Sequence, residues 1–102
     1  MLNYPPFGRL ARLRFESPER DQAIQRSQTI YRELSQLPGA AAVDLLGPSE
    51  AFLERAKGIY RWDLLLKGRE LQALRSLLGA ARQLCASRKW PFAVDVDPYG
   101  AG

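Results

Sequence analysis

Residues 9–15 alternate between apolar and charged side chains, with Ala11, Leu13 and Phe15 on one side and Arg12 and Arg14 on the other. Successive residues of a β-strand point to opposite faces, so this alternation predicts a strand with one buried face. The same period recurs in residues 59–67 and 91–97, and a short apolar strand, residues 43–46, ends at a Gly-Pro turn. The predicted inward positions of the two later strands are Tyr60, Trp62, Leu64 and Leu66, then Phe92, Val94 and Val96.

Between these strands, apolar residues recur at helical spacing in two segments. The first helix is predicted to begin with Ser17 as its N-cap and Pro18 at its first position, and to stop at Pro38-Gly39. The second follows the break at Gly68 and covers residues 69–87. The apolar stripes are Ile24, Ile30 or Tyr31, Leu34 and Leu37 in the first helix, and Leu71, Leu74, Leu77, Leu78, Ala81, Leu84 and Cys85 in the second.

The resulting order, βαββαβ, predicts an α+β fold: a two-layer sandwich with a four-stranded, mostly antiparallel sheet and two helices on one face. One apolar face per strand and one apolar stripe per helix are what this architecture buries. Residues 1–8, with two prolines and a glycine, are predicted to be an extended linker. Residues 9–98 form one domain in this interpretation, and residues 99–102 a flexible tail.

Composition narrows the possible chemistry. The net charge of +4 and pI near 9.6 are compatible with nucleic acid or an acidic peptide as partner. There is no histidine, and the single cysteine, Cys85, allows no intramolecular disulfide or four-cysteine zinc site. Neither phosphate-binding glycine motif is present. We therefore expect no catalytic residue, metal or cofactor in this domain. We also expect a cytoplasmic location, because the chain has no membrane-spanning run or signal peptide.

Three aspartates offer an alternative interpretation. Asp95 and Asp97 are two residues apart on a predicted strand and so share a face, and Asp63 lies on a neighbouring strand. A carboxylate cluster of this kind binds metals or transfers protons. The simpler interpretation, which we favour, is a solvated strand face whose aspartates pair with Arg12, Arg14 or Arg61 across the sheet.

An RNA-recognition module is a second alternative, because such modules share the βαββαβ order. Their stacking aromatics lie on the open face of the sheet. Here Tyr60 and Trp62 have the same parity as Leu64 and Leu66, which are predicted to be core. The phase of the strand therefore opposes an RNA-recognition surface.

Most of the basic residues are arginines, whose planar guanidinium group suits phosphate and carboxylate ligands. One group precedes and enters the third strand: Arg55, Lys57 and Arg61. A second lies where the second helix begins: Lys67, Arg69, Gln72 and Arg75. A helix N-terminus adds free N–H groups and positive potential, so this second group is a candidate anion site. The alternative is that these residues are solvated or paired with Glu54, Asp63 and Glu70.

Four short motifs in order resemble the C-terminal domain of the bacterial primosomal replication-restart helicase family (primosomal protein N′). The motifs are Pro5-Pro6-Phe7, Leu46-Gly47-Pro48, Arg61-Trp62-Asp63-Leu64-Leu65-Leu66, and Val94-Asp95-Val96-Asp97-Pro98. The resemblance implies a fold similar to a small-subunit ribosomal protein. It also implies that residues 1–8 lead out of a preceding helicase lobe, and that zinc, ATP and magnesium belong to other domains of the parent helicase.

The resemblance further implies a non-catalytic role in replication restart, in the bacterial cytoplasm at the nucleoid. The expected partners are branched or single-stranded DNA, the acidic tail of single-stranded DNA-binding protein, and the helicase lobes. We expect Arg55, Lys57, Arg61 and Lys67 to contact DNA. The family's tail-binding Arg and Gln correspond to Arg69 and Gln72, with Arg75 beside them. The alternative is a structural docking domain that packs on the helicase lobes and touches DNA little. An independent small enzyme is a remote third possibility.

Overall fold

The computed structural model describes residues 9–51 and 58–96, and it has the predicted element order with one added 3-10 helix. The elements are β1 (Arg9–Ser17), α1 (Arg20–Ser35), η1 (Pro38–Ala42), β2 (Val43–Glu50), β3 (Tyr60–Gly68), α2 (Leu71–Arg88) and β4 (Ala93–Val96). The predicted linker, residues 1–8, and the predicted tail, residues 99–102, lie outside the described residues.

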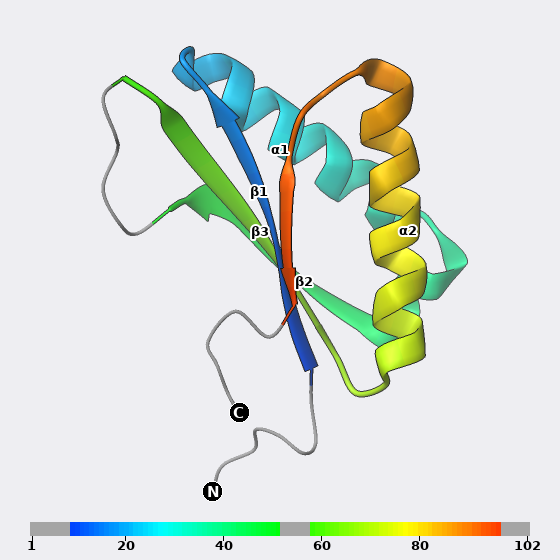
Figure 1. Ribbon diagram of the computed structural model, residues 1–102. Coiled ribbons are helices and arrows are strands. Elements are labelled where there is room, and N and C mark those ends of the chain that lie inside the picture. The colour runs from blue at the N-terminus through cyan, green and yellow to red at the C-terminus, as the bar shows by residue number, and fades with distance from the viewer. Residues whose placement is uncertain (1–8, 52–57, 97–102) are drawn as a thin grey trace, which may run out of the picture.

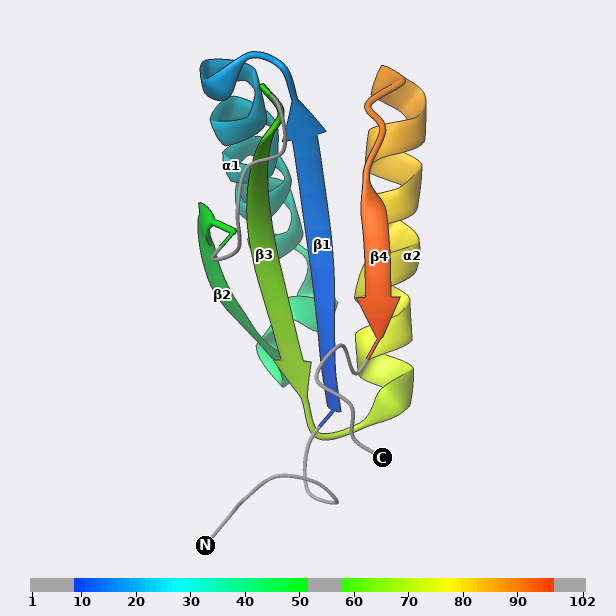
Figure 2. The ribbon, with the colours of Figure 1, turned by 60° about the vertical axis from the view of Figure 1, so that its left-hand side comes forward.

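The four strands form one sheet in the order β2-β3-β1-β4, and every neighbouring pair is antiparallel. Strands β1 and β3 occupy the centre and pair over nine residues, from Arg9 opposite Gly68 to Ser17 opposite Tyr60. Both helices cover the same face of the sheet (Figure 1), and Figure 2 shows that the other face carries no helix. The predicted two-layer α+β sandwich is confirmed.

The core lies between the sheet and the two helices. Ala11, Leu13 and Phe15 of β1 are fully buried, as are Leu64 and Leu66 of β3. Val43 of β2 joins this apolar layer, and the helices contribute Ile30 and Leu34 from α1, and Leu74, Leu77, Leu78, Ala81 and Cys85 from α2. The period-2 and helical patterns of the sequence thus identified most of the buried positions. Val96 is an exception: it was predicted to point inward, but it ends edge strand β4 and is 47% exposed. In α1, Ile24 is only partly buried, whereas Ala23 and Ser27 are buried.

The first helix begins later than predicted. Ser17 is the last residue of β1, paired with Tyr60, and α1 begins at Arg20. The Ser17 hydroxyl accepts a hydrogen bond from the Glu19 N–H (2.9 Å) and donates one to Gln22 Oε1 (2.8 Å). The prediction of Ser17 as N-cap was therefore wrong. Strand pairing holds its backbone in the sheet, while its side chain still supports the first turn from outside the helix.

Strand β2 does not end at Gly47-Pro48, as the sequence predicted, but continues to Glu50. The pairing with β3 shifts register between Leu46 and Ser49, so the Gly-Pro pair forms an irregularity within the strand. Gly47 has a φ of 104°, which side-chain-bearing residues rarely adopt. A β-carbon at Gly47 would lie 3.1 Å from the Asp63 carbonyl oxygen and 3.1 Å from the Ser49 nitrogen. A turn residue is thereby accommodated inside a strand.

We expect Gly47→Ala to lower the free energy of unfolding by about 1–2 kcal/mol, because the left-handed backbone is costly for alanine and the added methyl meets backbone atoms of β2 and β3. Urea denaturation followed by tryptophan fluorescence measures this change. Gly39→Ala is the matched control, since a β-carbon there meets only Leu77 at an ordinary 3.9 Å. Equal effects of the two substitutions would contradict the role assigned to Gly47.

Candidate nucleic-acid and partner interface

The turn from β3 into α2 brings together the residues predicted to bind an acidic tail. We call Lys67, Arg69, Gln72 and Arg75 the α2 entrance; all four side chains are exposed. Gly68, between the first two, is buried against Val43, and it holds the turn against the sheet. The helix follows at once, with the Leu74 N–H donating to the Glu70 carbonyl at 3.2 Å. The structure thus places these cations at the start of a helix, as the sequence predicted.

The electrostatics of the α2 entrance favour an anion. Within residues 9–51 and 58–96, Lys67, Arg69 and Arg75 form no ion pair with a carboxylate. The N-cap residue, Glu70, makes no side-chain capping hydrogen bond, so its carboxylate does not occupy the first-turn N–H groups. Free N–H groups and the positive end of the helix dipole attract negative charge. The entrance therefore presents three uncompensated cations beside an uncapped helix end.

Of the residues predicted to contact DNA, the two that the structure describes, Arg61 and Lys67, lie far apart. Arg55 and Lys57 lie outside the described residues. Arg61 and Lys67 both point to the helix-free face of the sheet, but they are six positions apart on β3, which is about 20 Å. Arg61 Nε donates to Glu16 Oε2 at 2.6 Å, whereas Lys67 lies opposite Asp44 in the register without forming an ion pair. Lys67 consequently groups with the α2 entrance rather than with Arg61.

Cross-strand ion pairs fill much of the helix-free face. Arg14 donates two hydrogen bonds to Asp63, at 2.8 and 2.9 Å, and Arg12 donates to Asp95 at 2.6 Å. The hydrogen bond to Asp63 raises the pKa of Arg14 above its usual value, since it stabilises the charged guanidinium group. These pairs confirm the interpretation of Asp63 and Asp95 as partners of strand arginines. Asp97 lies outside the described residues, and within them no group of three potential metal ligands occurs.

The aromatic residues of β3 face the helices, as their parity predicted. Trp62 is 8% exposed, and Arg20 of α1 stacks over its ring at 5.4 Å from the centroid. The helix-free positions of β1 and β3 are Leu10, Arg12, Arg14 and Glu16, with Arg61, Asp63, Leu65 and Lys67. Since none of these is aromatic, the two central strands offer no stacking platform of the RNA-recognition type.

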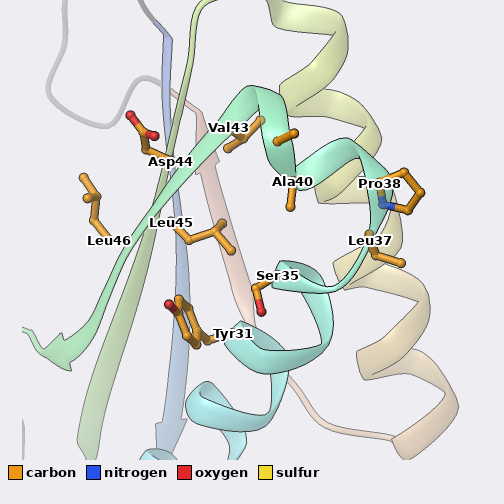
Figure 3. A pocket seen from close by; sticks show the side chains of 10 residues that line it. Tyr31, Ser35, Leu37, Pro38, Ala40, Val43, Asp44, Leu45 and Leu46 are labelled. Atoms are coloured by element: carbon orange, nitrogen blue, oxygen red, sulfur yellow. The ribbon is translucent and has the colours of Figure 1, made fainter.

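An apolar groove beside β2 was missed by the sequence analysis. It has a volume of about 590 Å³ and lies between the end of α1, η1 and the free edge of β2 (Figure 3). Tyr31 and Leu45 point into this space from α1 and β2, whereas Leu46 points away from it and is 45% exposed. The only sequence signal was the pair Leu45-Leu46, in which two adjacent apolar residues place one on each face of an edge strand.

Arg88 and Trp90 connect the C-terminal end of α2 to α1. Arg88 lies 5.2 Å from the Trp90 ring centroid and donates to Glu33 of α1 at 2.6 Å, while Arg26 of α1 lies 5.4 Å from the same ring. This arrangement closes over Cys85, which is fully buried. Burial raises the pKa of the Cys85 thiol to about 11 against the opposing effect of the two arginines. The cysteine is therefore a protonated part of the core.

We expect Cys85 to resist thiol reagents at pH 8 until the chain unfolds, because the reactive thiolate is scarce and the side chain inaccessible. Its pKa is higher in the folded protein than in the unfolded chain. The stability it contributes is therefore fully present below about pH 9 and is lost as the pH rises toward 11. Labelling with a chromogenic disulfide, with and without urea, tests the first point. The free energy of unfolding measured as a function of pH, for the wild type and for Cys85→Ala, tests the pH dependence. Rapid labelling of the native protein would contradict both expectations.

No helix within residues 9–51 and 58–96 is long and apolar enough to span a membrane.

In fold, the chain is similar to two designed proteins. De novo designed protein Foldit4 matches with a TM-score of 0.61 at 12% identity, covering 87% of this chain and 92% of that one. De novo designed protein Ferredog-Diesel matches with a TM-score of 0.51 at 14% identity, covering 94% and 89%. At such low identity these likenesses concern the fold alone.

Sequence comparison is more specific. A "Probable replication restart protein PriA" from Deinococcus radiodurans is 36% identical over 96 residues, which is 94% of this chain and 10% of the relative. A "Replication restart protein PriA" from Synechocystis sp. is 36% identical over 101 residues, 96% of this chain and 12% of the relative. The chain thus spans about a tenth of the length of these relatives. The profile of the family described as "Primosomal protein N C-terminal domain" matches residues 1–99, and the chain belongs to this family.

Proposed function

We propose that this chain is a non-catalytic module of bacterial replication restart that contacts branched DNA and binds the acidic tail of single-stranded DNA-binding protein. Family membership indicates the process, and one structural observation supports the binding role. The α2 entrance presents exposed cations, without carboxylate partners among the described residues, at a helix start that has no side-chain cap. In this proposal the domain holds no cofactor. Zinc, ATP and magnesium act in other parts of a longer parent helicase, in the cytoplasm at the nucleoid.

The tail site consists of Arg69, Gln72 and Arg75. Gln72 and Arg75 lie in the first two turns of α2, and Arg69 precedes the N-cap, so the three side chains surround the helix start. Arginine binds carboxylates through two parallel hydrogen bonds, and glutamine both donates and accepts. A short acidic peptide with a terminal carboxylate suits this combination. Contacts of this exposed kind weaken as salt screens them.

The DNA site consists of Arg55, Lys57, Arg61 and Lys67, with branched or single-stranded DNA as ligand. Exposed cations bind the phosphate backbone irrespective of sequence, and the affinity falls steeply with salt because counterions are released. Lys67, which lacks an ion pair within the described strands, is better placed than Arg61 for such a contact. Arg61 must share its guanidinium group between Glu16 and a phosphate.

NMR titration of the ¹⁵N-labelled chain tests both halves of the proposal. A forked DNA should shift resonances around the four DNA residues, and the shifts should diminish when salt rises from about 50 to 200 mM. A peptide with the acidic tail sequence should shift those of Arg69, Gln72 and Arg75, and a peptide with amides in place of its carboxylates should not. Absence of localised shifts with either ligand at low salt would overturn the proposal.

The groove beside β2 supports a second candidate, a docking domain that packs on the helicase lobes. The groove is apolar and open, and it adjoins an edge strand with exposed Leu46. The relatives are about ten times longer than the matched region, so most of their mass lies outside it. A salt-independent complex between the domain and purified helicase lobes, lost in Tyr31→Lys, would favour docking, because Tyr31 points into the groove. A salt-sensitive DNA complex unaffected by Tyr31→Lys would favour the first candidate.

A further inference from the structure

The positive charge of this chain is concentrated in one helix. Residues 71–89, which are α2 and its C-cap, contain four basic residues and no acidic one. The other eleven basic residues are matched by the eleven acidic residues, so this segment accounts for the whole net charge of +4. Helix α1 is different, since it contains Asp21 and Glu33 among its arginines. A single-sign helix surface in an otherwise neutral chain is a distinct electrostatic feature.

Three of these cations lie along the exposed side of α2. Arg82 follows Arg75 by seven residues, which is two helical turns or about 10.5 Å, and Lys89 follows by seven more. All three are exposed and form no ion pair within the described residues. The fourth cation, Arg88, is bound to Glu33 of α1. We call Arg75, Arg82 and Lys89 the α2 row. Helix α2 lies at the margin of the helical layer (Figures 1 and 2).

Two residues on the exposed side of α2 are unfavourable for the stability of the helix. Gly79 lies in the middle of the exposed side of α2, where glycine is among the poorest helix formers. A β-carbon there would meet nothing within 4 Å, so packing inside the domain does not require a glycine. Lys89 occupies the C-cap with a φ of 58°, a conformation that favours glycine. Local rules are most often broken at functional positions. A bare backbone at Gly79 permits a close approach from outside, and Lys89 retains a cation.

We infer that the α2 row binds the phosphate backbone of duplex DNA, with the duplex passing close over Gly79. The inference rests on the proposed function, because it names the part of a branched DNA that this second surface takes. The exposed side of α2 carries no aromatic residue on which unpaired bases could stack, which favours a duplex arm over a single strand. The remaining exposed residues are small or amide: Gln72, Ser76, Gln83, Ala86 and Ser87.

Fluorescence anisotropy with the full 102-residue chain and a labelled duplex tests the inference. Arg82→Gln should weaken duplex binding about tenfold at 50 mM salt and about threefold at 200 mM, and lower the salt slope by about 0.9, as expected for one lost phosphate contact. Arg32→Gln is the matched control, since Arg32 is an exposed arginine of α1 without an ion pair in the described region. It should change affinity by less than about twofold.

Two further variants separate binding from folding. Lys89→Gly and Gly79→Gln should both raise the urea midpoint, because each installs a residue that the local backbone favours. Both should nevertheless weaken duplex binding, the first by losing a cation and the second by obstructing the approach. A residue with a purely structural role would move stability and affinity in the same direction.

The outcomes distinguish this inference from the proposed function. If the wild-type chain binds neither a fork nor a duplex at about 50 mM salt, the DNA part of the proposed function fails. If it binds a fork but Arg82→Gln behaves like Arg32→Gln, only the α2 row is overturned. Loss of acidic-peptide binding in Arg82→Gln with duplex binding intact would assign the row to a peptide and would also overturn the inference. Weaker duplex binding by all three α2 variants supports it.

Discussion

Replacing Phe15 with alanine should lower the free energy of unfolding by about 3–5 kcal/mol, the range for truncating a buried aromatic residue. Phe15 is fully buried in central strand β1, opposite Trp62, and its ring stacks on Phe92 with centroids 6.0 Å apart. Truncation removes that stack and leaves a cavity between the sheet and the helices. Domains of this size have only about 5–15 kcal/mol of stability in total.

Phe92→Ala is the control for Phe15→Ala. Phe92 belongs to the same ring pair but is only partly buried, on the approach to edge strand β4. It should cost roughly half as much, because part of its surface already meets water. Urea denaturation with tryptophan fluorescence gives both values from Trp62 and Trp90. If Phe92→Ala proves the costlier substitution, β4 rather than β1 anchors the core, and the assignment of Phe15 as its centre is wrong.

The central strands explain why the fold was predictable. Nine residues of β1 pair with nine of β3, and one face of each is buried while the other is not. Such a strand must alternate, because any shift by one residue would expose the apolar set. The helices likewise bury one stripe each, so periodicity identified Leu74, Leu77 and Ala81 as core. Patterns enforced by burial are visible in a sequence.

Two details of the backbone were not predicted correctly from the sequence. The Gly47-Pro48 pair predicted a turn, because Gly and Pro usually interrupt a strand. In the structure β3 continues to pair beyond it, and tertiary contacts override the local preference. Ser17 shows the same effect at the start of α1, where the sheet retains a residue with a high N-cap preference. Neither the irregularity at Gly47-Pro48 nor the position of Ser17 in β1 can be predicted without knowing which strand pairs with these residues.

The candidate site was predictable in part for a similar reason. Cations at a helix start form a local pattern, so Arg69, Gln72 and Arg75 were found from the sequence and lie together. Whether an arginine is paired depends on strand order, which brings Glu16 beside Arg61 and Asp63 beside Arg14. The groove beside β2 depends on how η1 packs, and no repeating pattern encodes it. The sequence therefore shows where the charged residues lie, but only the fold shows which of them form ion pairs.

The second large effect concerns the ion pair between Arg14 and Asp63. Asp63→Asn should destabilise the protein by about 2 kcal/mol, because it leaves a charged guanidinium group on the sheet without its carboxylate. The two side chains are only 25% and 14% exposed, so water compensates them incompletely. Asp95→Asn, which breaks the pair with Arg12, should cost less than about 1 kcal/mol, since Asp95 is half exposed. A double-mutant cycle with Arg14→Gln isolates the coupling, and a value near zero would contradict this account.

The same variant identifies which face of the domain binds the duplex arm, separately from the DNA contacts proposed at Arg61 and Lys67. Asp63→Asn releases the Arg14 guanidinium group on the helix-free face, at the centre of the sheet. If that face carried the duplex, the freed cation would strengthen duplex binding and steepen its salt dependence by about one phosphate contact. If the duplex lies along the α2 row, on the other layer of the sandwich, affinity should change by less than about twofold. We expect the second result, because ion pairs neutralise the helix-free face and leave the net positive charge on α2.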